Sequence, residues 1–169
     1  MAESLIKSLD ESARWSLRLP PTVAGALREL AGFGIAMHIN RCTSGGEKLA
    51  ARLGPDEWLL CAPAGFAPRV EMDVAAALAG EPHSLVDVSH RYAALAVEGP
   101  HAATLLAAGC PLDLHAKTFV AGSATRTLFG RAEIILWRMH EAPVYRVECA
   151  RSHARYLDDF LREAAREFA

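Results

Sequence analysis

The stretch from Ser123 to Phe168 reads SATRTLFGRAEIILWRMHEAPVYRVECARSHARYLDDFLREAAREF. Its apolar periodicity predicts three consecutive strands, at Ser123–Phe129, Ala132–Met139 and Val144–Cys149. A helix is predicted from Ser152 to about Phe168, because apolar residues recur there on one helical face. The residues of that face are Tyr156, Leu157, Phe160, Leu161 and Ala164. Three strands followed by an amphipathic helix indicate an α+β fold.

Upstream of this stretch, the pattern predicts a strand at Ala93–Val97, a Gly99-Pro100 turn and a helix over about His101–Ala108. The first half of the chain is predicted to repeat the order. Its elements are a strand near Trp15–Leu19, a helix over about Thr22–Ala31, strands at Ile35–Ile39, Leu49–Leu53 and Trp58–Cys61, and a helix over about Pro68–Ala79. A strand at Leu85–Val88 is predicted between the halves.

Two β-α-β-β-β-α halves are therefore expected, at about residues 15–79 and 93–168, within a single domain of residues 1–169. The turn residues Gly54, Pro55 and Asp56 predict a hairpin in the first half. We expect this hairpin to match the one at Phe129-Gly130-Arg131, which would make Trp58 and Ile134 counterparts.

Composition excludes several classes of function. The chain has 169 residues, 51% hydrophobic and 22% charged, with a formal net charge of -2. This balance supplies no basic field for nucleic acid. The longest apolar runs, such as Val74–Ala79 and Ile134–Trp137, fall far short of the roughly 20 residues that a membrane span needs. The N-terminus resembles no export or transit signal, so a cytoplasmic location is expected.

The four cysteines are predicted to be free, buried thiols that bind no metal. They are Cys42, Cys61, Cys110 and Cys149, and they form neither a CxxC pair nor a cluster at zinc spacing.

The most enzyme-like cluster is Asp87-Val88-Ser89-His90-Arg91. On an extended strand the side chains of Ser89 and His90 would point to opposite faces, which disfavours a nucleophile and base pair. A turn role is favoured instead, with Asp87 or Ser89 hydrogen-bonded to nearby backbone amides.

The remaining candidates are also interpreted as structural. Cys110 lies near a predicted helix end, where the helix dipole disfavours a thiolate, so a thiol hydrolase using Cys110 and His90 is a weak alternative. The glycines fit neither GxGxxG nor a phosphate loop, and His101, His115 and His140 are interpreted as surface or turn residues. Three arginines are expected to cover apolar surface or to pair with acids such as Glu133 and Glu148; they are Arg126, Arg131 and Arg138. No catalytic, cofactor-binding or metal-binding residue is assigned.

Several segments resemble the gamma-subunit family of heterotetrameric sarcosine oxidases. The segments are LGPDEWLL at Leu53–Leu60, Ser84–Arg91, GCPLDL at Gly109–Leu114, Thr125–Thr127, Glu133–Arg138 and the pattern Arg151–Leu161. The family is similar in turn to the folate-binding T-protein, an aminomethyltransferase, whose segments resemble Ser89-His90-Arg91 and Gly99-Pro100. The resemblance implies a duplicated α+β fold like the folate-binding domain of that protein.

The resemblance also implies a function. The whole complex would demethylate sarcosine oxidatively to glycine, release hydrogen peroxide and transfer the one-carbon unit to tetrahydrofolate. This chain would be a non-catalytic structural subunit with no cofactor of its own. FAD, FMN, NAD and tetrahydrofolate would lie in the alpha and beta partner subunits, and the isolated chain could form a homodimer. The alternative is a stand-alone folate-binding one-carbon transfer protein.

Overall fold

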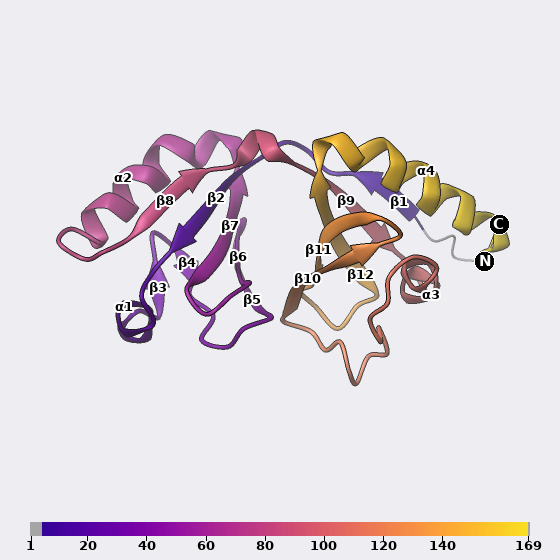
Figure 1. Ribbon diagram of the computed structural model, residues 1–169, viewed down its shortest axis with the longest axis horizontal. Coiled ribbons are helices and arrows are strands. Elements are labelled where there is room, and N and C mark those ends of the chain that lie inside the picture. The colour runs from indigo at the N-terminus through magenta and orange to yellow at the C-terminus, as the bar shows by residue number, and fades with distance from the viewer. Residues whose placement is uncertain (1–4, 169) are drawn as a thin grey trace. The chain divides into compact units, whose positions relative to one another are not determined.

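The computed structural model describes residues 5–168, which divide into two compact units. Unit 1 joins the N-terminal residues up to Asp10 with the chain from His90 onward. Unit 2 runs from Glu11 to Ser89. Each unit has antiparallel strands, helices and an apolar core (Figure 1).

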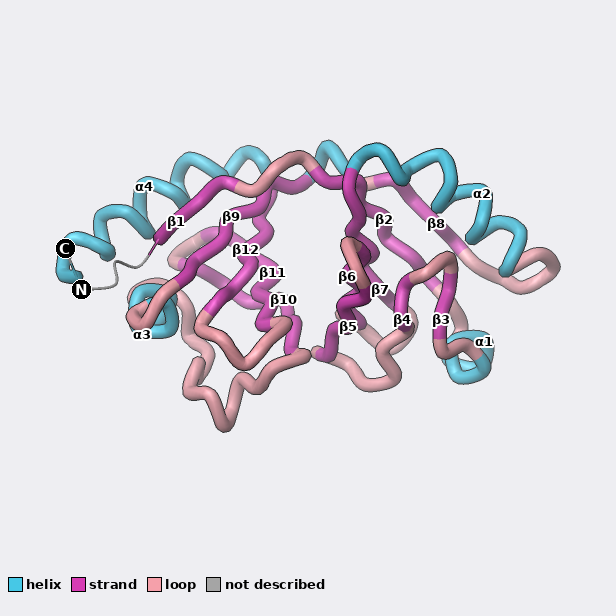
Figure 2. Tube along the Cα trace, turned by 180° about the vertical axis from the view of Figure 1, so that it is seen from behind, coloured by secondary structure: helices cyan, strands magenta, loops and turns pink. Residues whose placement is uncertain are grey.

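In unit 2, antiparallel strands follow the order β5-β6-β7-β2-β8. Their bounds are β2 Ser12–Arg18, β5 Arg41–Gly45, β6 Lys48–Arg52, β7 Glu57–Pro63 and β8 Ser84–Asp87. The other elements are α1 Pro21–Ala26, the short hairpin β3 Glu29–Leu30 and β4 Phe33–Gly34, and α2 Ala67–Ala77. Helix α2 lies along β2 and β8 in both ribbon and tube views (Figures 1 and 2).

In unit 1, antiparallel strands follow the order β10-β11-β12-β9-β1. Their bounds are β1 Leu5–Ser8, β9 Tyr92–Glu98, β10 Ser123–Phe129, β11 Ala132–Arg138 and β12 Val144–Ala150. The helices are α3 Ala102–Ala107 and α4 Ala154–Ala165, with 3-10 turns at Arg151–His153 and Arg166–Phe168. Helix α4 lies along β1 and β9 (Figure 1), as α2 does along the edge of its own sheet.

The strand registers show that the two units are copies of one pattern. In unit 2, Leu17 is paired with Trp58 on one side and with Leu85 on the other. In unit 1, Val97 is paired with Tyr145 and with Ile6 in the same way. The helices agree as well, because each buries two residues one turn apart against its sheet. These pairs are Val70 and Val74 in α2, and Leu157 and Leu161 in α4. The predicted duplicated α+β fold is confirmed.

Each repeat gives its first strand to the other unit. In chain order the first repeat begins with β1 and β2, and the second begins with β8 and β9. Strand β1 is nevertheless paired with β9, and β8 with β2. An equivalent backbone hydrogen bond extends each of these two strand pairs. The Leu9 N–H donates to the Ala94 carbonyl beyond the end of β1, and the Val88 N–H donates to the Arg14 carbonyl beyond the end of β8. The repeats are therefore linked by exchanged edge strands.

The predicted match between hairpins is wrong. The turn after Leu53 joins β6 to β7, and its counterpart joins β11 to β12. The turn at Gly130 joins β10 to β11 and corresponds to the β5–β6 turn. Trp58 consequently corresponds to Tyr145 on β12, and not to Ile134 on β11. Turns that contain glycine occur at both places, at Gly54 and Gly130, so turn residues alone do not show which strands are joined.

Two element predictions in the first half are also wrong. The segment Ile35–Ile39 forms no strand, and the helix predicted over Thr22–Ala31 ends at Ala26. Ala31 and Gly32 have positive φ values of 51° and 81°, which turn the chain tightly between β3 and β4. Strands β1 and β5 were not predicted.

Each unit buries a separate apolar core beneath its helices. In unit 2 the cluster is built around Trp15, Trp58 and Phe33. In unit 1 it is built around Phe129, Tyr145 and neighbours from α3 and α4. In the part of the chain that is described, no helix is long and apolar enough to cross a membrane.

The close approach of Gly109 to Phe129 gives a test of the unit 1 core. A Cβ at Gly109 would lie 2.9 Å from the ring of Phe129, which is fully buried. We expect Gly109→Ala to lower the free energy of unfolding by about 1–3 kcal/mol, because an overpacked core must shift. Gly65→Ala is the control, since a Cβ there meets nothing within 4 Å. Urea unfolding measures both, and equal stability of the two variants would contradict this packing.

Candidate functional site

The Asp87–Arg91 cluster is a turn that fastens the end of β8 to β2. The Ser89 hydroxyl donates to Asp87 Oδ1 at 2.5 Å and accepts from the Arg14 amide at 2.9 Å. Asp87 Oδ1 also accepts from the Ser89 amide at 2.8 Å. The predicted turn role is confirmed for Asp87, whereas the Ser89 hydroxyl accepts from an amide on β2 that is distant in the sequence. The acid orients the hydroxyl itself, which is not the arrangement of a serine nucleophile and histidine base.

The polar groups of the GCPLDL segment likewise form hydrogen bonds within their own loop. Cys110 is buried in the unit 1 core, and its Sγ lies 4.0 Å from Thr127 Oγ1. Asp113 Oδ1 accepts from the His115 amide at 3.0 Å. That bond, together with one to the Thr118 side chain, lowers the pKa of Asp113. His115 Nδ1 accepts in turn from the Lys117 amide, which agrees with the predicted turn role of this histidine.

Other candidates are also placed by the structure. His101 is stacked on Phe168 with ring centroids 4.7 Å apart. No group of three potential metal ligands occurs within residues 5–168. Arg131 lies over the ring of Tyr156 and so covers apolar surface, as predicted. Glu148 is fully buried, and it accepts from Arg146 Nε at 2.7 Å.

Two arginines, Arg52 and Arg138, hold the loop ends of the two units, and only Arg138 was singled out from the sequence. At the end of β6, Arg52 donates to the carbonyl of Met37 through Nη1 and to that of Pro55 through Nη2, the latter at 2.5 Å. Its backbone carbonyl accepts from the Asn40 amide at 2.9 Å. One side chain thereby joins the segment before β5 to the β6–β7 turn. We call this set of bonds the Arg52 clamp.

The Arg138 clamp repeats this arrangement at the end of β11. Arg138 Nη1 donates to the Phe119 carbonyl at 2.6 Å, and Nη2 donates to the Glu141 carbonyl at 3.1 Å. Its backbone carbonyl accepts from the Gly122 amide at 2.8 Å. Gly122 and its counterpart Asn40 both have positive φ, 77° and 63°. Arg138 also pairs with a nearby acid, as predicted, since its Nη2 lies 3.8 Å from Glu141 Oε2, but its shortest hydrogen bonds go to backbone carbonyls.

The two clamps hold loops whose apolar side chains differ in their exposure to solvent. In unit 1, Phe119 is 7% exposed and is stacked against Tyr145, with ring centroids 6.4 Å apart. In unit 2, the equivalent Met37 is 48% exposed. Trp58 is fully buried beneath Arg52, whose guanidinium lies 4.6 Å from the ring centroid. The two repeats thus hold the same backbone geometry with a covered loop in one and an exposed loop in the other.

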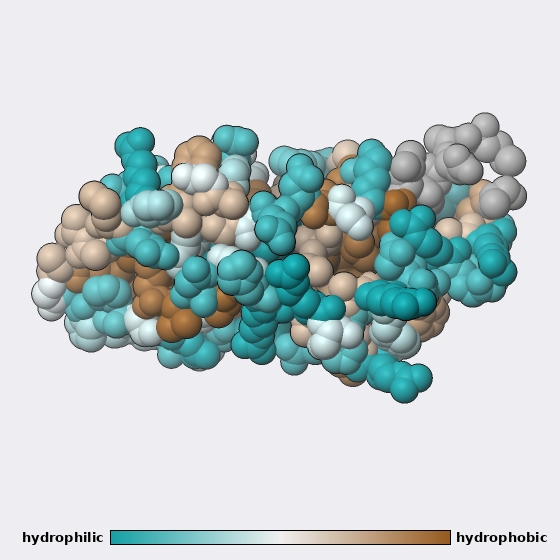
Figure 3. Space-filling view, turned by 90° about the horizontal axis from the view of Figure 1, so that it is seen from above, coloured by the Kyte–Doolittle hydropathy of each residue, from teal (hydrophilic) through white to brown (hydrophobic). Residues whose placement is uncertain are grey.

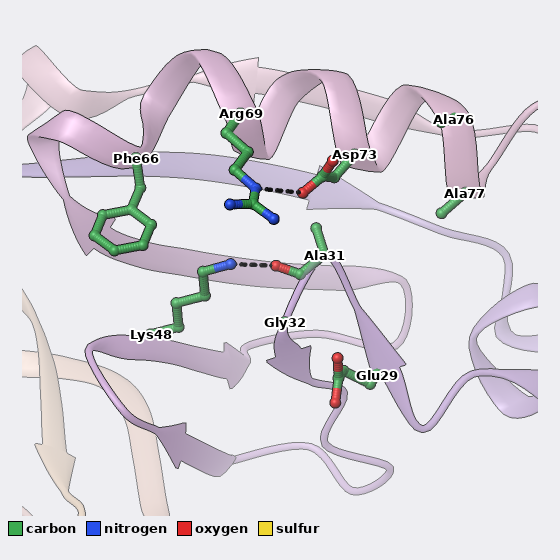
Figure 4. A pocket seen from close by; sticks show the side chains of 9 residues that line it. All are labelled: Glu29, Ala31, Gly32, Lys48, Phe66, Arg69, Asp73, Ala76 and Ala77. Carbon is green, nitrogen blue, oxygen red and sulfur yellow. Dashed lines mark hydrogen bonds and ion pairs between the residues drawn. The ribbon is translucent and has the colours of Figure 1, made fainter.

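Unit 2 also has a pocket of about 710 Å³ between α2 and the β3–β4 hairpin (Figure 4). Lys48 Nζ donates to the Ala31 carbonyl at 2.5 Å and lies near the rings of Phe33 and Phe66. Arg69 and Asp73 form an ion pair along the helix, at 3.5 Å. The charged residues of the lining are Glu29, Lys48, Arg69 and Asp73, two of each sign. The lining therefore gives no net charge that would select an anion or a cation.

These features define a duplicated α+β protein, in which the polar clusters described above support the chain's own turns and loops. The fold resembles glycine cleavage system aminomethyltransferase T from Bartonella henselae, with a TM-score of 0.69 at 18% identity. The likeness covers 95% of this chain and 45% of that protein, and at this identity it bears on the fold alone.

The chain belongs to the Sarcosine oxidase, gamma subunit family, which it matches over residues 18–167. It is 31% identical over 167 residues to a sarcosine oxidase subunit gamma from Arthrobacter sp, covering 95% of this chain and 81% of that protein. The relative from Corynebacterium sp. (strain P-1) is 33% identical over 145 residues, covering 85% and 70%.

A chain of the heterotetrameric sarcosine oxidase from Corynebacterium sp. U-96, solved in complex with pyrrole 2-carboxylate, has a similar structure. The TM-score is 0.87 at 28% identity, and the match covers 98% of this chain and 85% of that chain.

The clamps give a prediction about stability. Removing either guanidinium leaves carbonyl oxygens without their donors, and each buried acceptor left so costs about 1–3 kcal/mol. We expect Arg138→Met to destabilise more than Arg52→Met, because Arg138 is 4% exposed whereas Arg52 is half-buried. Arg69→Met is the control, since its ion pair is exposed and should contribute within about 0.5 kcal/mol. Thermal unfolding followed by circular dichroism ranks the three variants, and equal effects would contradict the clamps.

The cysteines give a second prediction, which depends on pH. All four are free and buried, as the sequence predicted. Burial raises the pKa of Cys42 and of Cys149 from the ordinary 9.0 to about 11. Because the unfolded chain ionises these thiols first, folding stability should fall as the pH rises from about 9 to 11. The double variant Cys42→Ala/Cys149→Ala should lose less stability over that range.

Alkylation measures the same property directly. At pH 8, iodoacetamide should label the native protein slowly and the unfolded protein at all four thiols. Rapid labelling of Cys42 or Cys149 in the native protein would show that these thiols are not shielded by burial.

Proposed function

We propose that this chain is a non-catalytic structural subunit of a heterotetrameric sarcosine oxidase. The observation that carries the proposal is the match to one chain of that oxidase from Corynebacterium sp. U-96 along almost the whole length of both chains. Family membership over residues 18–167 supports it. The complex would demethylate sarcosine oxidatively, with release of hydrogen peroxide and transfer of the one-carbon unit to tetrahydrofolate.

In this proposal the larger alpha and beta subunits hold FAD, FMN, NAD and tetrahydrofolate. Two observations on this chain support such a division of labour. Its glycines do not follow the spacing of a dinucleotide-binding loop. Its most enzyme-like cluster, at Asp87 and Ser89, is engaged in a turn. The chain would then contribute through the contacts that it makes with the other subunits.

Co-expression with the other subunits tests the proposal. We expect the complete set of genes to yield a complex that contains this chain, and omission of the chain to lower the yield or turnover of the complex at least about tenfold. The isolated chain should neither oxidise sarcosine nor retain a flavin on purification. Full yield and activity without the chain would refute the structural role. Sarcosine turnover or one-carbon transfer by the chain alone would show that it is an enzyme.

A further inference from the structure

The segment of residues 35–40, here called the Met37 loop, presents two large apolar side chains to solvent. Met37 is 48% exposed and Ile39 is 47% exposed. The two residues are only two positions apart in the sequence. On the face shown in Figure 3, hydrophobic residues occur in small groups separated by hydrophilic ones. Two neighbouring exposed apolar residues therefore need a physical reason.

Mobility of the Met37 loop does not supply that reason, because its backbone is anchored on both sides. The Ile35 amide donates to the Arg28 carbonyl at 2.9 Å, and the indole Nε1 of Trp58 donates to the Ala36 carbonyl at 3.1 Å. The Arg52 clamp then binds the carbonyl of Met37 and the amide of Asn40. A loop held in this way loses little conformational entropy when its side chains enter a binding partner.

In the second repeat, the side chain at the equivalent loop position is buried by residues of its own unit. Phe119 stands where Met37 does, on the same kind of clamp, and is buried against Tyr145. In unit 2 the Tyr145 position is taken by Trp58, which lies beneath Arg52 and leaves Met37 outside. The apolar side chain on the clamped loop is therefore buried in unit 1, whereas the equivalent side chain in unit 2 is left exposed.

The charges beside the Met37 loop indicate what kind of partner surface would bind it. Arg18 is paired with Asp56 at 2.9 Å and with Glu57 at 3.3 Å. Together with Arg52 and with Arg41, which directly follows the loop and is paired with Arg52 between β5 and β6, these side chains carry three positive and two negative charges. A set of charges so close to balance favours an apolar and uncharged counterpart over a strongly charged surface.

We infer that Met37 and Ile39 insert into an apolar, uncharged hollow on one of the other subunits of the oxidase, an inference that rests on the proposed function. Two side chains are too few for a whole interface, which buries about 800 Å² on each partner. They would act as anchors near the centre of a larger contact, since a few well-packed residues carry most of the affinity. Methionine suits this role, because its flexible thioether adapts to an irregular hollow.

The test compares two double variants of the full chain. Met37→Ser/Ile39→Ser removes the apolar anchors. Met72→Ser/Leu128→Ser is the matched control, because these residues are also exposed, at 71% and 49%, but lie on α2 and β10. Binding is measured by biolayer interferometry against the purified assembly of the other subunits, made without this chain. Differential scanning fluorimetry follows the thermal stability of each variant.

We expect the anchor variant to bind at least about tenfold more weakly and the control to bind within about twofold of wild type. The ratio of the anchor variant's Kd to that of wild type should not change between about 0.05 and 0.5 M salt, because screening affects charges and not apolar contacts. The Tm of the anchor variant should stay within about 2 °C of wild type, since Arg52 and Trp58 still hold the loop.

Other outcomes would overturn the inference in distinguishable ways. Wild-type affinity in the anchor variant would show that the Met37 loop does not dock on these subunits. A homodimer of the isolated chain that the anchor variant dissociates, with unchanged binding to the assembly, would assign the loop to a second copy. If wild type itself fails to bind the assembly, the proposed function falls and the inference falls with it.

Discussion

In each unit, the guanidinium of one arginine joins two loops that lie beyond the end of the sheet. Hydrogen bonds between strands fix the sheet itself, but the segment before β5 or β10 and the turn after β6 or β11 lie outside that ladder. Arginine suits this place because its planar fork offers several donors in fixed directions. Arg52 and Arg138 use them to bind equivalent carbonyls, of Met37 and Pro55 in one unit and of Phe119 and Glu141 in the other.

The clamps explain why some elements could be predicted from the sequence and others could not. Strands β10, β11 and β12 and helix α4 were predicted to within about a turn, because their burial follows periods of two and 3.6 residues. The segment Ile35–Ile39 also has apolar residues at alternate positions, yet it is no strand. Its backbone carbonyls are bound by side chains of Trp58 and Arg52 instead of by a neighbouring strand.

The clamps themselves could not be predicted from one sequence. A carbonyl acceptor has no residue signature, and the arginines are separated from the carbonyls that they bind by up to 22 positions. A clue was nevertheless present, because each arginine is the penultimate residue of a predicted strand just before a turn. The pairing of hairpins failed because turn residues do not show which strands a turn joins, whereas the strand registers do.

Duplication followed by divergence at one position gives the two units different surfaces. The clamp, the positive φ of Asn40 and Gly122, and the helix pairs are shared. Phe119 is covered by its own unit, whereas Met37 and Ile39 are held outward on a fixed backbone. Because the polar clusters described above support turns and loops, the Met37 loop is the feature best suited to contact another protein. The structural role proposed for this chain and the docking of the Met37 loop are thus two parts of one account.

Hydrogen–deuterium exchange of the chain, free and within the assembled oxidase, tests that account most directly. Assembly should slow the exchange of peptides that cover residues 35–40 and 53–56, because partner atoms would exclude water from the Met37 loop and the adjoining turn. Peptides from the interior strand β11 should exchange equally slowly in both states. Unchanged exchange at residues 35–40, with new protection confined to other surfaces of the chain, would contradict the central claim.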